Sequence, residues 1–530
     1  MPVVSRGNAL VASPNADPRR VCSGALLPAL AVLALSGCAG LLARAPDVAA
    51  DGAVIPSAWQ APLPHGGQTG ELARWWEQFD DPLLTALVVN AQAVSPTLAA
   101  ARTRIEQARA SRVAAGAALL PDVAAAASAA RGRQDISFPL GTALSAGLQA
   151  GWELDLFGRD RAARDAAAER LIGAEAGWHE ARVALAAEAG SAYVGLRACE
   201  AQLEQTQLDT RSRSETARLT DLSARAGFQP PAAAALARAS AAQGRGNETQ
   251  QRARCRLDLN ALVALTGLPG AALQAALAPA TARLPRPALL DVPAVPAEAL
   301  AQRPDVYRAA REVLAAASDA VQADAERYPR ITLSGSVGAA RFETSSATLS
   351  GPLWTLGPVR VSLPIFDAGT RRANVAAARA RYDEALITYG ARLRGAIREV
   401  EDALVGLAAT AARDEDAQIA AASFLESFRA TEERQRGGLA SLFELEDARR
   451  SAVLAQSTLV DLQRERVAAW IALYRALGGG WRRAEAVGTG ATSPAAGPAL
   501  PPSGAAATAS VAAPPPFSAA GAAPPPAGAR

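Results

Sequence analysis

The sequence has few of the residues on which most enzymes depend. Its 530 residues include two His, four Cys and one Met, and it contains no Lys. His65 and His179 alone can build neither a His-centred triad nor a His-rich metal site. The sequence also lacks a phosphate-binding loop, a CxxC pair and a nucleophile elbow. We therefore predict no catalytic residue, no cofactor and no metal, which argues against an enzyme.

Aromatic residues and charge of one sign are also scarce. Aromatics make up 5% of the chain, and 54 basic against 51 acidic residues give a formal net charge of +3. Interspersed charges of both signs are typical of solvated helix faces and argue against binding to nucleic acid. Half of the residues are hydrophobic, and many of these are Ala, which suits long helices packed at close range.

Long apolar runs are absent beyond the N-terminus, so we expect no transmembrane helix. Near the N-terminus, Arg19 and Arg20 precede an apolar run over 21–35, a pattern typical of a secretory signal. The run ends in Leu-Ser-Gly-Cys38, which resembles the bacterial lipobox. We therefore predict a signal peptide over 1–37 and an acylated Cys38 that anchors the chain to the outer membrane.

The chain contains an internal duplication. Pro96 and Pro304 are 208 residues apart, and so are Pro121 and Pro329. Two more pairs of landmarks keep this order with a slowly drifting offset: Leu154-Asp155-Leu156-Phe157 with Leu363-Pro364-Ile365-Phe366, and Ala226-Gly227-Phe228 with Gly437-Gly438-Leu439. Each copy is predicted to contain a helix, two strands, a long helix, a turn and a returning helix.

The two strands of each copy are predicted from apolar–polar alternation. The alternation is clearest over 331–337 and 359–365, and the first copy has weaker, Ala-rich equivalents near 122–133 and 142–155. One apolar and one polar face suit a barrel wall with lipid outside and water inside. A soluble sheet with the same pattern remains an alternative at this point.

Helices of unusual length follow the strands. They are predicted over 159–226 and 371–437, far longer than ordinary globular helices and each able to span roughly 100 Å. Their apolar residues recur at the spacing of coiled coils. The shorter helices that open the two copies are predicted over 90–120 and 300–328. His179 is predicted to lie on the surface of the first long helix.

Glycines end both long helices and predict antiparallel hairpins. Gly227 follows the first helix, and Gly437 and Gly438 follow the second, in positions where glycine supplies a left-handed cap. Cys199 and Cys255 are each 28 residues from Gly227, hence at a similar height on the first hairpin. The sequence leaves open whether they form a disulfide or remain two free buried thiols.

Several motifs together resemble one known family. The chain is similar to the TolC-like outer-membrane efflux proteins, and specifically to their lipoprotein branch of OprM-like and NodT-type channels. The resemblance covers about residues 70–480 and the lipobox. Its motifs are Trp75-Trp76-Glu77-Gln78-Phe79-Asp80-Asp81-Pro82-Leu83-Leu84, Trp152-Glu153-Leu154-Asp155-Leu156-Phe157-Gly158-Arg159, Leu363-Pro364-Ile365-Phe366-Asp367-Ala368-Gly369, and Gly438-Leu439-Ala440-Ser441-Leu442 followed by Leu445-Glu446-Asp447-Ala448-Arg449-Arg450.

This resemblance implies a mainly α fold with a transmembrane β-barrel, built as a homotrimer. Four strands from each of three copies would close a twelve-stranded barrel, and the helices would continue it as a periplasmic tunnel. The implied partners are a periplasmic membrane-fusion adaptor, an inner-membrane pump of the resistance–nodulation–division type and outer-membrane lipid. The hairpin ends at Gly227, Gly437 and Gly438 would meet the adaptor.

The resemblance also implies a periplasmic gate at Phe443, Asp447 and Arg450. Asp447 and Arg450 are three residues apart and lie on one helical face, so three copies could form a ring of charged contacts. An ordinary surface ion pair is the alternative reading of their spacing.

These predictions divide the chain into five parts: a signal peptide (1–37), a lipidated extension (38–84), two efflux repeats (85–285 and 286–483) and a Pro- and Ala-rich disordered tail (484–530). The function implied is passive, gated export of drugs or other small molecules. An outlet for type I protein secretion is the alternative, and a purely structural periplasmic coiled coil is a more distant one.

Overall fold

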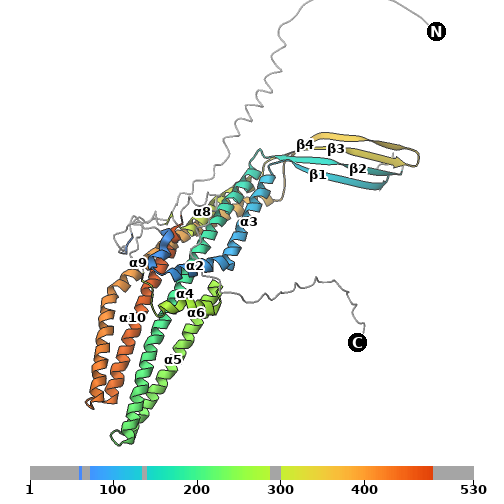
Figure 1. The fold of residues 1–530 in the computed structure, drawn as a ribbon. Coiled ribbons are helices and arrows are strands. Elements are labelled where there is room, and N and C mark those ends of the chain that lie inside the picture. The colour runs from blue at the N-terminus through green and yellow to red at the C-terminus, as the bar shows by residue number, and fades with distance from the viewer. Residues whose placement is uncertain (1–58, 62–71, 134–139, 287–299, 302, 482–530) are drawn as a thin grey trace, which may run out of the picture.

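The computed structural model is a helical shaft with one β-sheet at its end (Figure 1). It describes residues 59–61, 72–133, 140–286, 300–301 and 303–481. The predicted signal peptide, Cys38 and the predicted tail over 484–530 lie outside the described residues.

Both copies of the duplicated unit have the predicted order of elements. The first half contains η3 (Leu72–Phe79), α2 (Pro82–Val94), α3 (Pro96–Ala117), β1 (Asp122–Gly132), β2 (Gly141–Leu154), α4 (Arg159–Arg225), α5 (Pro231–Thr266), α6 (Gly270–Leu277) and η4 (Ala278–Ala280). The second contains α8 (Pro304–Ala325), β3 (Arg330–Thr344), β4 (Thr348–Ser362), α9 (Thr370–Arg436), α10 (Leu442–Ala476) and η5 (Gly478–Gly480). The two long helices are confirmed to within one residue at each end.

The first opening helix differs from its prediction. Instead of one helix over 90–120, the chain forms α2 and α3, which meet at a bend of 49°. Pro96 begins α3, and a proline disfavours helical geometry at the residue before it. Ser95 is accordingly extended, and its hydroxyl accepts a hydrogen bond from the N–H of Leu98 at 3.3 Å. The sequence pattern had concealed this break because apolar residues continue through it.

The returning helices pack against the long ones as two hairpins. Figure 1 shows α4 with α5, and α9 with α10, running side by side away from the sheet. Among the described helices, none is by itself long and apolar enough to cross a membrane. Two bent pairs, α2 with α3 and α5 with α6 and η4, meet that test of length and composition only when each pair is counted together.

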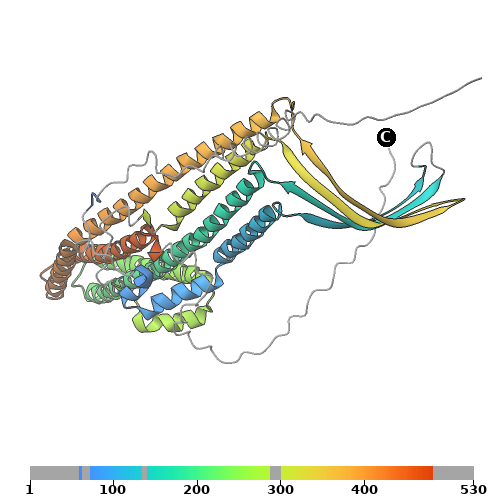
Figure 2. The ribbon, with the colours of Figure 1, turned by 90° about the horizontal axis from the view of Figure 1, so that it is seen from above.

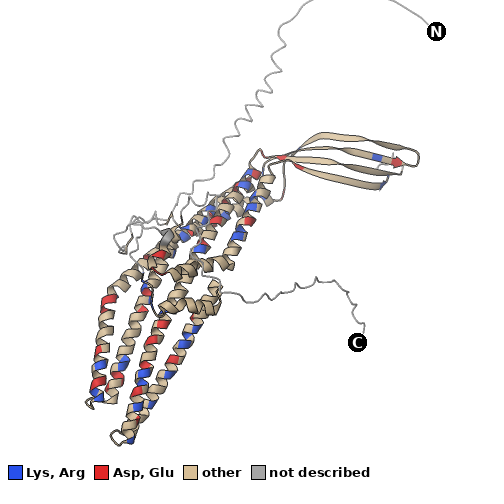
Figure 3. Ribbon diagram, viewed as in Figure 1, with Lys and Arg blue, Asp and Glu red and all other residues tan. Residues whose placement is uncertain are grey.

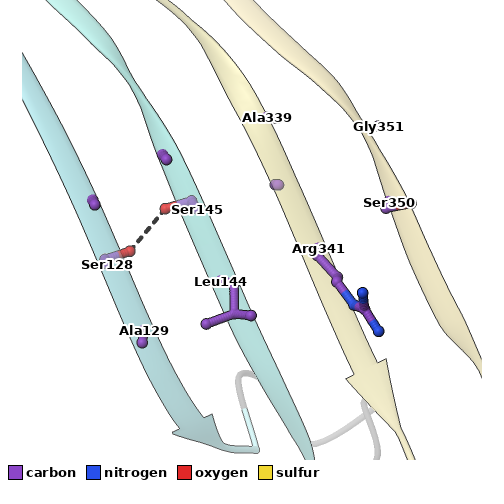
Figure 4. A pocket seen from close by; sticks show the side chains of 11 residues that line it. Ser128, Ala129, Leu144, Ser145, Ala339, Arg341, Ser350 and Gly351 are labelled. Atoms are coloured by element: carbon purple, nitrogen blue, oxygen red, sulfur yellow. Dashed lines mark hydrogen bonds between the residues drawn. The ribbon is translucent and has the colours of Figure 1, made fainter.

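The four strands form one antiparallel sheet in the order β1-β2-β3-β4. The sheet is strongly curved (Figure 2). Residues paired in register project to the same side, and hydroxyls meet across it: Ser128 with Ser145, drawn in Figure 4, and Ser336 with Thr355, each pair 2.8 Å apart. The other face carries large exposed apolar side chains, among them Leu148, Val337, Trp354 and Val359.

The strand boundaries agree with the sequence in the first copy, whereas in the second copy the alternation marks only part of each strand: β3 continues beyond 337 to Thr344, and β4 begins before 359, at Thr348. The first-copy strands, β1 and β2, lie within one residue of the predicted ranges 122–133 and 142–155. The predicted strand over 359–365 instead ends at Ser362. Pro364 has no N–H to donate to a neighbouring strand. The apolar–polar alternation of the sequence therefore continues beyond the last residue that is hydrogen-bonded in the sheet.

Each passage from sheet to long helix is fixed by an aspartate. The Asp155 carboxylate accepts hydrogen bonds from the N–H groups of Asp160 (3.2 Å) and Arg161 (2.9 Å) and from the Arg161 Nε (3.0 Å). In the second copy, Asp367 accepts from the N–H groups of Gly369 (3.0 Å) and Arg371 (3.1 Å). The acceptors satisfy donors that a helix N-terminus leaves free. The duplication thus preserves a capping device as well as a fold.

An aromatic cluster ties the N-terminal segment to the middle of the shaft. Trp75 is fully buried, with ring centroids 6.3 Å from Trp470 and 5.3 Å from Tyr474. Trp76 lies 5.0 Å from the Tyr474 ring and directly over Gly190. A Cβ at Gly190 would lie 2.5 Å from a carbon of the Trp76 ring, so glycine is required for this close approach.

The prediction that His179 lies on the surface is wrong. The side chain is half-buried between Trp178 and Trp481, with centroid distances of 4.9 and 6.0 Å. Burial, aided by the charge of Arg182, lowers the pKa of His179 to about 4. Trp481 follows the third glycine of the turn after α10, and its contact with α4 could not be inferred from sequence spacing.

The Asp155 cap makes a testable contribution to stability. Burial raises the pKa of Asp155, but the hydrogen bonds from Arg161 and Asp160 outweigh it and hold the pKa below its ordinary value. The stabilisation is therefore present above the unfolded-state pKa of about 3.9 and is lost as pH falls through the folded-state value. We expect Asp155→Ala to lower the free energy of unfolding by about 1 kcal/mol at pH 7.

Denaturation of the detergent-solubilised protein at pH 7 and at pH 3 measures this effect. Asp155→Asn keeps an acceptor for the N–H groups and is the control that should lose only the pH dependence. Equal stability of Asp155→Ala and the wild type at pH 7 would contradict the capping role.

Candidate gate and docking surface at the hairpin ends

The two hairpin turns have the same local structure. Gly227 and Gly438 adopt left-handed conformations with φ of 79° and 74°. In both turns the next residue donates a hydrogen bond back into the last helical turn, Phe228 to the Ser223 carbonyl at 2.9 Å and Leu439 to the Arg434 carbonyl at 2.8 Å. Such a turn needs glycine at its left-handed position.

The turns end in exposed apolar side chains. Phe228 is 84% exposed and Leu439 is 76% exposed at equivalent positions of the two hairpins. Gly437, predicted with Gly438 as a left-handed cap, has φ −78° and keeps a helical φ. The left-handed role therefore belongs to Gly438 alone, as it belongs to Gly227 in the first hairpin.

The predicted gate residues lie on the exposed face of α10, just after this turn. Phe443 is 72% exposed, and Asp447 and Arg450 are also exposed. The Arg450 guanidinium lies 3.7 Å from the Asp447 carboxylate. The structure thus brings Asp447 and Arg450 together, while Phe443 stands apart one turn earlier. Within a single chain this pair contributes about 0–1 kcal/mol, because water screens it.

The opposite face of α10 carries a buried cluster that the sequence did not predict. Arg449 is 1% exposed and donates to Glu446 in its own helix, and to Ser212 (3.1 Å) and Thr216 (2.9 Å) of α4. We call the set that joins α4, α5 and α10 the inter-hairpin cluster, and define it as Asp209, Arg213, Ser240, Glu446 and Arg449.

The inter-hairpin cluster is closely connected. Arg213 donates to Asp209 at 2.8 Å, to Ser240 at 2.8 Å and to Glu446 at 3.2 Å. The Ser240 hydroxyl donates to Glu446 at 2.9 Å. Two arginines thus balance two carboxylates where the first and second repeats meet. Removal of one partner from such a buried set costs about 3–5 kcal/mol, because it leaves an uncompensated charge.

The cluster is nevertheless incompletely bonded. The Asp209 Oδ1 and the Arg449 Nε are 4.0 Å apart, and neither has a hydrogen-bond partner among the described residues. Sequence reasoning missed the cluster because its pairs have the spacing of surface ion pairs: Asp209 and Arg213 are four residues apart, and Glu446 and Arg449 three. The only available signal was that Arg449 shares a face of α10 with the apolar residues Leu445 and Ala452, which are buried.

Cys199 and Cys255 face one another across the first hairpin. The structure joins them as a disulfide, with an S–S distance of 2.14 Å and 5.5 Å between Cα atoms. Gln251 donates to the Cys199 carbonyl and to Gln202, each at 3.3 Å, and Gln202 donates to Asp461 of α10 at 2.8 Å. The cross-link therefore lies where α4, α5 and α10 are in mutual contact.

Comparison with known proteins identifies the family to which this combination of sheet and helical hairpins belongs. The family described as "Outer membrane efflux protein" matches residues 87–268 and 295–479. The outer membrane protein OprJ of Pseudomonas aeruginosa is 33% identical over 464 residues, covering 83% of this chain and 94% of OprJ. The solvent efflux pump outer membrane protein SrpC of Pseudomonas putida is 31% identical over 475 residues, covering 86% of this chain and 98% of SrpC.

A solved structure agrees with these relatives. The outer-membrane channel OprN superimposes with a TM-score of 0.72 at 29% identity, and the match covers 83% of this chain and 98% of OprN. The family match spans both duplicated units, including the four strands and both hairpins. The chain belongs to the outer membrane efflux protein family.

Proposed function

We propose that three copies of this chain form an outer-membrane duct for a tripartite efflux system. In this proposal a pump of the resistance–nodulation–division type in the inner membrane, joined through a periplasmic adaptor, supplies drugs or other small molecules. The duct itself is passive and gated, and it takes no part in chemistry. The observation that carries the proposal is a two-faced sheet with open edges, attached to hairpins long enough to cross a wide aqueous space.

The open edges support a trimer. Among the described strands, β1 pairs only with β2 and β4 pairs only with β3. Unpaired backbone groups on either edge would each cost several kcal/mol in lipid, where water cannot satisfy them. Pairing β4 of one copy with β1 of the next removes every edge once the ring closes. At four strands per copy, the twelve-stranded barrel that the family resemblance implies would take three copies.

The hairpin ends support contact with an adaptor. Phe228 and Leu439 give each copy two exposed apolar tips at one end of the shaft. Three copies would present six such tips in a ring around the entrance. A soluble protein rarely leaves apolar residues repeated in this way without a partner.

The two faces of α10 suggest how the entrance closes. We propose that Asp447 and Arg450, with Phe443, line the constriction and meet the same residues of neighbouring copies. On the opposite face, the inter-hairpin cluster holds α10 against α4 and α5 in the same copy. Opening moves the α9–α10 hairpin outward, so it must break contacts on both faces of α10. Because two polar atoms of the inter-hairpin cluster already lack a hydrogen-bond partner in the described part of the chain, the cluster holds the hairpin weakly enough for it to open and close again.

The proposed cargo is a small molecule and not a secreted protein. The name of SrpC refers to solvent efflux, which supports the small-molecule reading over a type I secretion outlet. The sheet and the family match leave no room for a purely structural coiled coil. The lipid anchor on Cys38 remains a proposal, carried by the lipobox alone.

Purification in detergent and reconstitution in a planar bilayer test the proposal as a whole. We expect a trimer that conducts ions, and a deletion strain that gains sensitivity to antibiotics or solvents and regains resistance with the intact gene. A purified protein that is monomeric or does not conduct would overturn the duct.

The first gate prediction concerns the exposed pair. Asp447→Ala with Arg450→Ala should raise single-channel conductance and antibiotic uptake, because the ring of charged contacts is lost. Arg413→Ala with Glu465→Ala is a matched control, since that exposed pair joins α9 and α10 at 3.1 Å away from the turn. Wild-type conductance in the first variant, or an equal rise in the control, would remove Asp447 and Arg450 from the gate.

The second gate prediction concerns the buried face. Arg449→Met leaves Asp209 and Glu446 with one arginine between them, which should weaken the closed state by roughly 3–5 kcal/mol. We expect a leak larger than that of the exposed double variant, with the trimer retained on native gels. A variant that remains trimeric and tightly closed would show that the inter-hairpin cluster has no role in closure.

A third prediction concerns the cross-link between α4 and α5. Thiol titration of the unfolded, non-reduced protein should find Cys199 and Cys255 unreactive. Because the bond closes a loop of 56 residues, Cys199→Ala with Cys255→Ala should cost about 4 kcal/mol in the chain-entropy picture. Two reactive thiols in the wild type, matched by unchanged thermal stability in the double variant, would exclude the disulfide.

A further inference from the structure

The apolar face of the sheet ends abruptly near the hairpins that join its strands. Successive rows of paired residues can be followed across the register from the helical end outward. The first five rows on this face contain no charged or hydroxyl side chain: Leu154, Ile331, Val361; Trp152, Leu333, Val359; Val123, Ala150, Gly335, Leu356; Ala125, Leu148, Val337, Trp354; and Ala127, Ala146, Ala339, Pro352.

The next two rows change character on nearly every strand. The sixth contains Ala129, Leu144, Arg341 and Ser350, and the seventh contains Arg131, Thr142, Glu343 and Thr348. Figure 3 shows the charged residues of the sheet near its two ends, with red at the helical end and both blue and red at the far end. Ten residues separate Ile331 from Arg341, which is about 33 Å along a strand and about 25 Å after a tilt of about 40°. Arg341 therefore stands at the edge of a band as tall as the hydrocarbon layer.

A hollow lies directly inside this edge. It measures about 700 Å³, and its lining includes Ala127, Ala129, Ala146 and Ala339, with Arg341 at one side. Leu144 and Arg341 project from this face, whereas Ser128 and Ser145 project from the other (Figure 4). Small side chains in four neighbouring positions leave room for an apolar chain against the sheet, and the arginines lie where its polar head would be.

We propose that Arg131, Arg341 and the alanine hollow form a binding site for a phosphorylated lipid of the outer leaflet. The inference rests on the proposed function, which places this end of the sheet at the cell exterior. The lipid phosphates accept hydrogen bonds from the two guanidinium groups, and an acyl chain lies in the hollow. Arginine suits this role because its planar fork binds phosphate through two parallel hydrogen bonds.

The charges of this edge leave the arginines available. Arg341 lies 3.3 Å from Glu343 in an exposed pair that uses one of its five N–H donors. Arg131 is exposed and makes no ion pair with any residue that the structure describes. Two strand spacings, about 10 Å, separate β1 from β3, so one headgroup with two phosphates can reach both arginines. The neighbouring Glu343 carboxylate repels the lipid phosphates, so removal of its charge should raise the affinity for the lipid, whereas removal of the arginines should lower it.

Binding of diphosphoryl lipid A to the purified full-length trimer, measured by native mass spectrometry, tests the proposal. Each arginine near an anionic lipid surface should contribute about fivefold, so Arg131→Gln with Arg341→Gln should weaken binding about twenty-five-fold. Replacement of both by Lys should restore most of the affinity. Glu343→Gln should strengthen binding, and lipid A without phosphates should bind weakly to every variant.

Arg360 supplies the matched control. It pairs with Thr332 on the polar face near the helical end of the sheet. Arg360→Gln therefore removes one positive charge from the sheet without changing the proposed lipid site. Ala339→Phe should fill the hollow and reduce binding. Ala126→Phe should not reduce it, because residue 126 lies outside the lining and its side chain projects to the other face. Equal affinity of the double variant and the wild type, an equal loss in Arg360→Gln, or tight binding of the phosphate-free lipid would overturn the site. A double variant that still forms conducting trimers separates this outcome from failure of the duct.

Discussion

Backbone hydrogen bonding at the two edges of the sheet is the constraint on which the rest of the molecule depends. A strand in lipid must have both of its edges paired, and β1 and β4 each lack one neighbour among the described strands. Closure must therefore come from other copies of the chain. Once copies stand in a ring, the helices that continue from each strand are carried into a ring as well. The aspartates at Asp155 and Asp367 fix the direction in which that continuation begins.

Duplication gives the chain two hairpins of the same fold, but the contacts that hold each hairpin together differ. Both end in the same glycine turn with an exposed apolar residue. The first hairpin also carries the Cys199–Cys255 cross-link, whereas the second presents α10 with charges on two faces. A cross-linked hairpin resists splaying, so movement is easier in the one that is held by polar contacts. The buried charges of the inter-hairpin cluster hold that hairpin in place without a covalent bond.

The two faces of the sheet differ in polarity, as contact with a membrane on one side requires. The register places apolar side chains in consecutive rows on one face, whereas the other face carries the paired hydroxyls together with Leu349 and Leu353. Arginine on a lipid-facing strand is costly at mid-depth and tolerated near the interface. The first arginines on the apolar face appear at the end of the apolar band. At this depth they are not buried in hydrocarbon and can bind lipid phosphates.

The sequence by itself determined the duplication, the order of elements, the two long helices and the strands, because each follows from a local period or from a glycine or proline. It also determined the family, through motifs that lie at element boundaries. The tertiary structure alone decided the bend at Ser95, the burial of His179 and the inter-hairpin cluster. Glu446 and Arg449 have the spacing of a solvated pair, and only the packing of α10 against α4 buries them. Spacing along a helix fixes which residues share a face, but what covers that face depends on residues more than two hundred positions away.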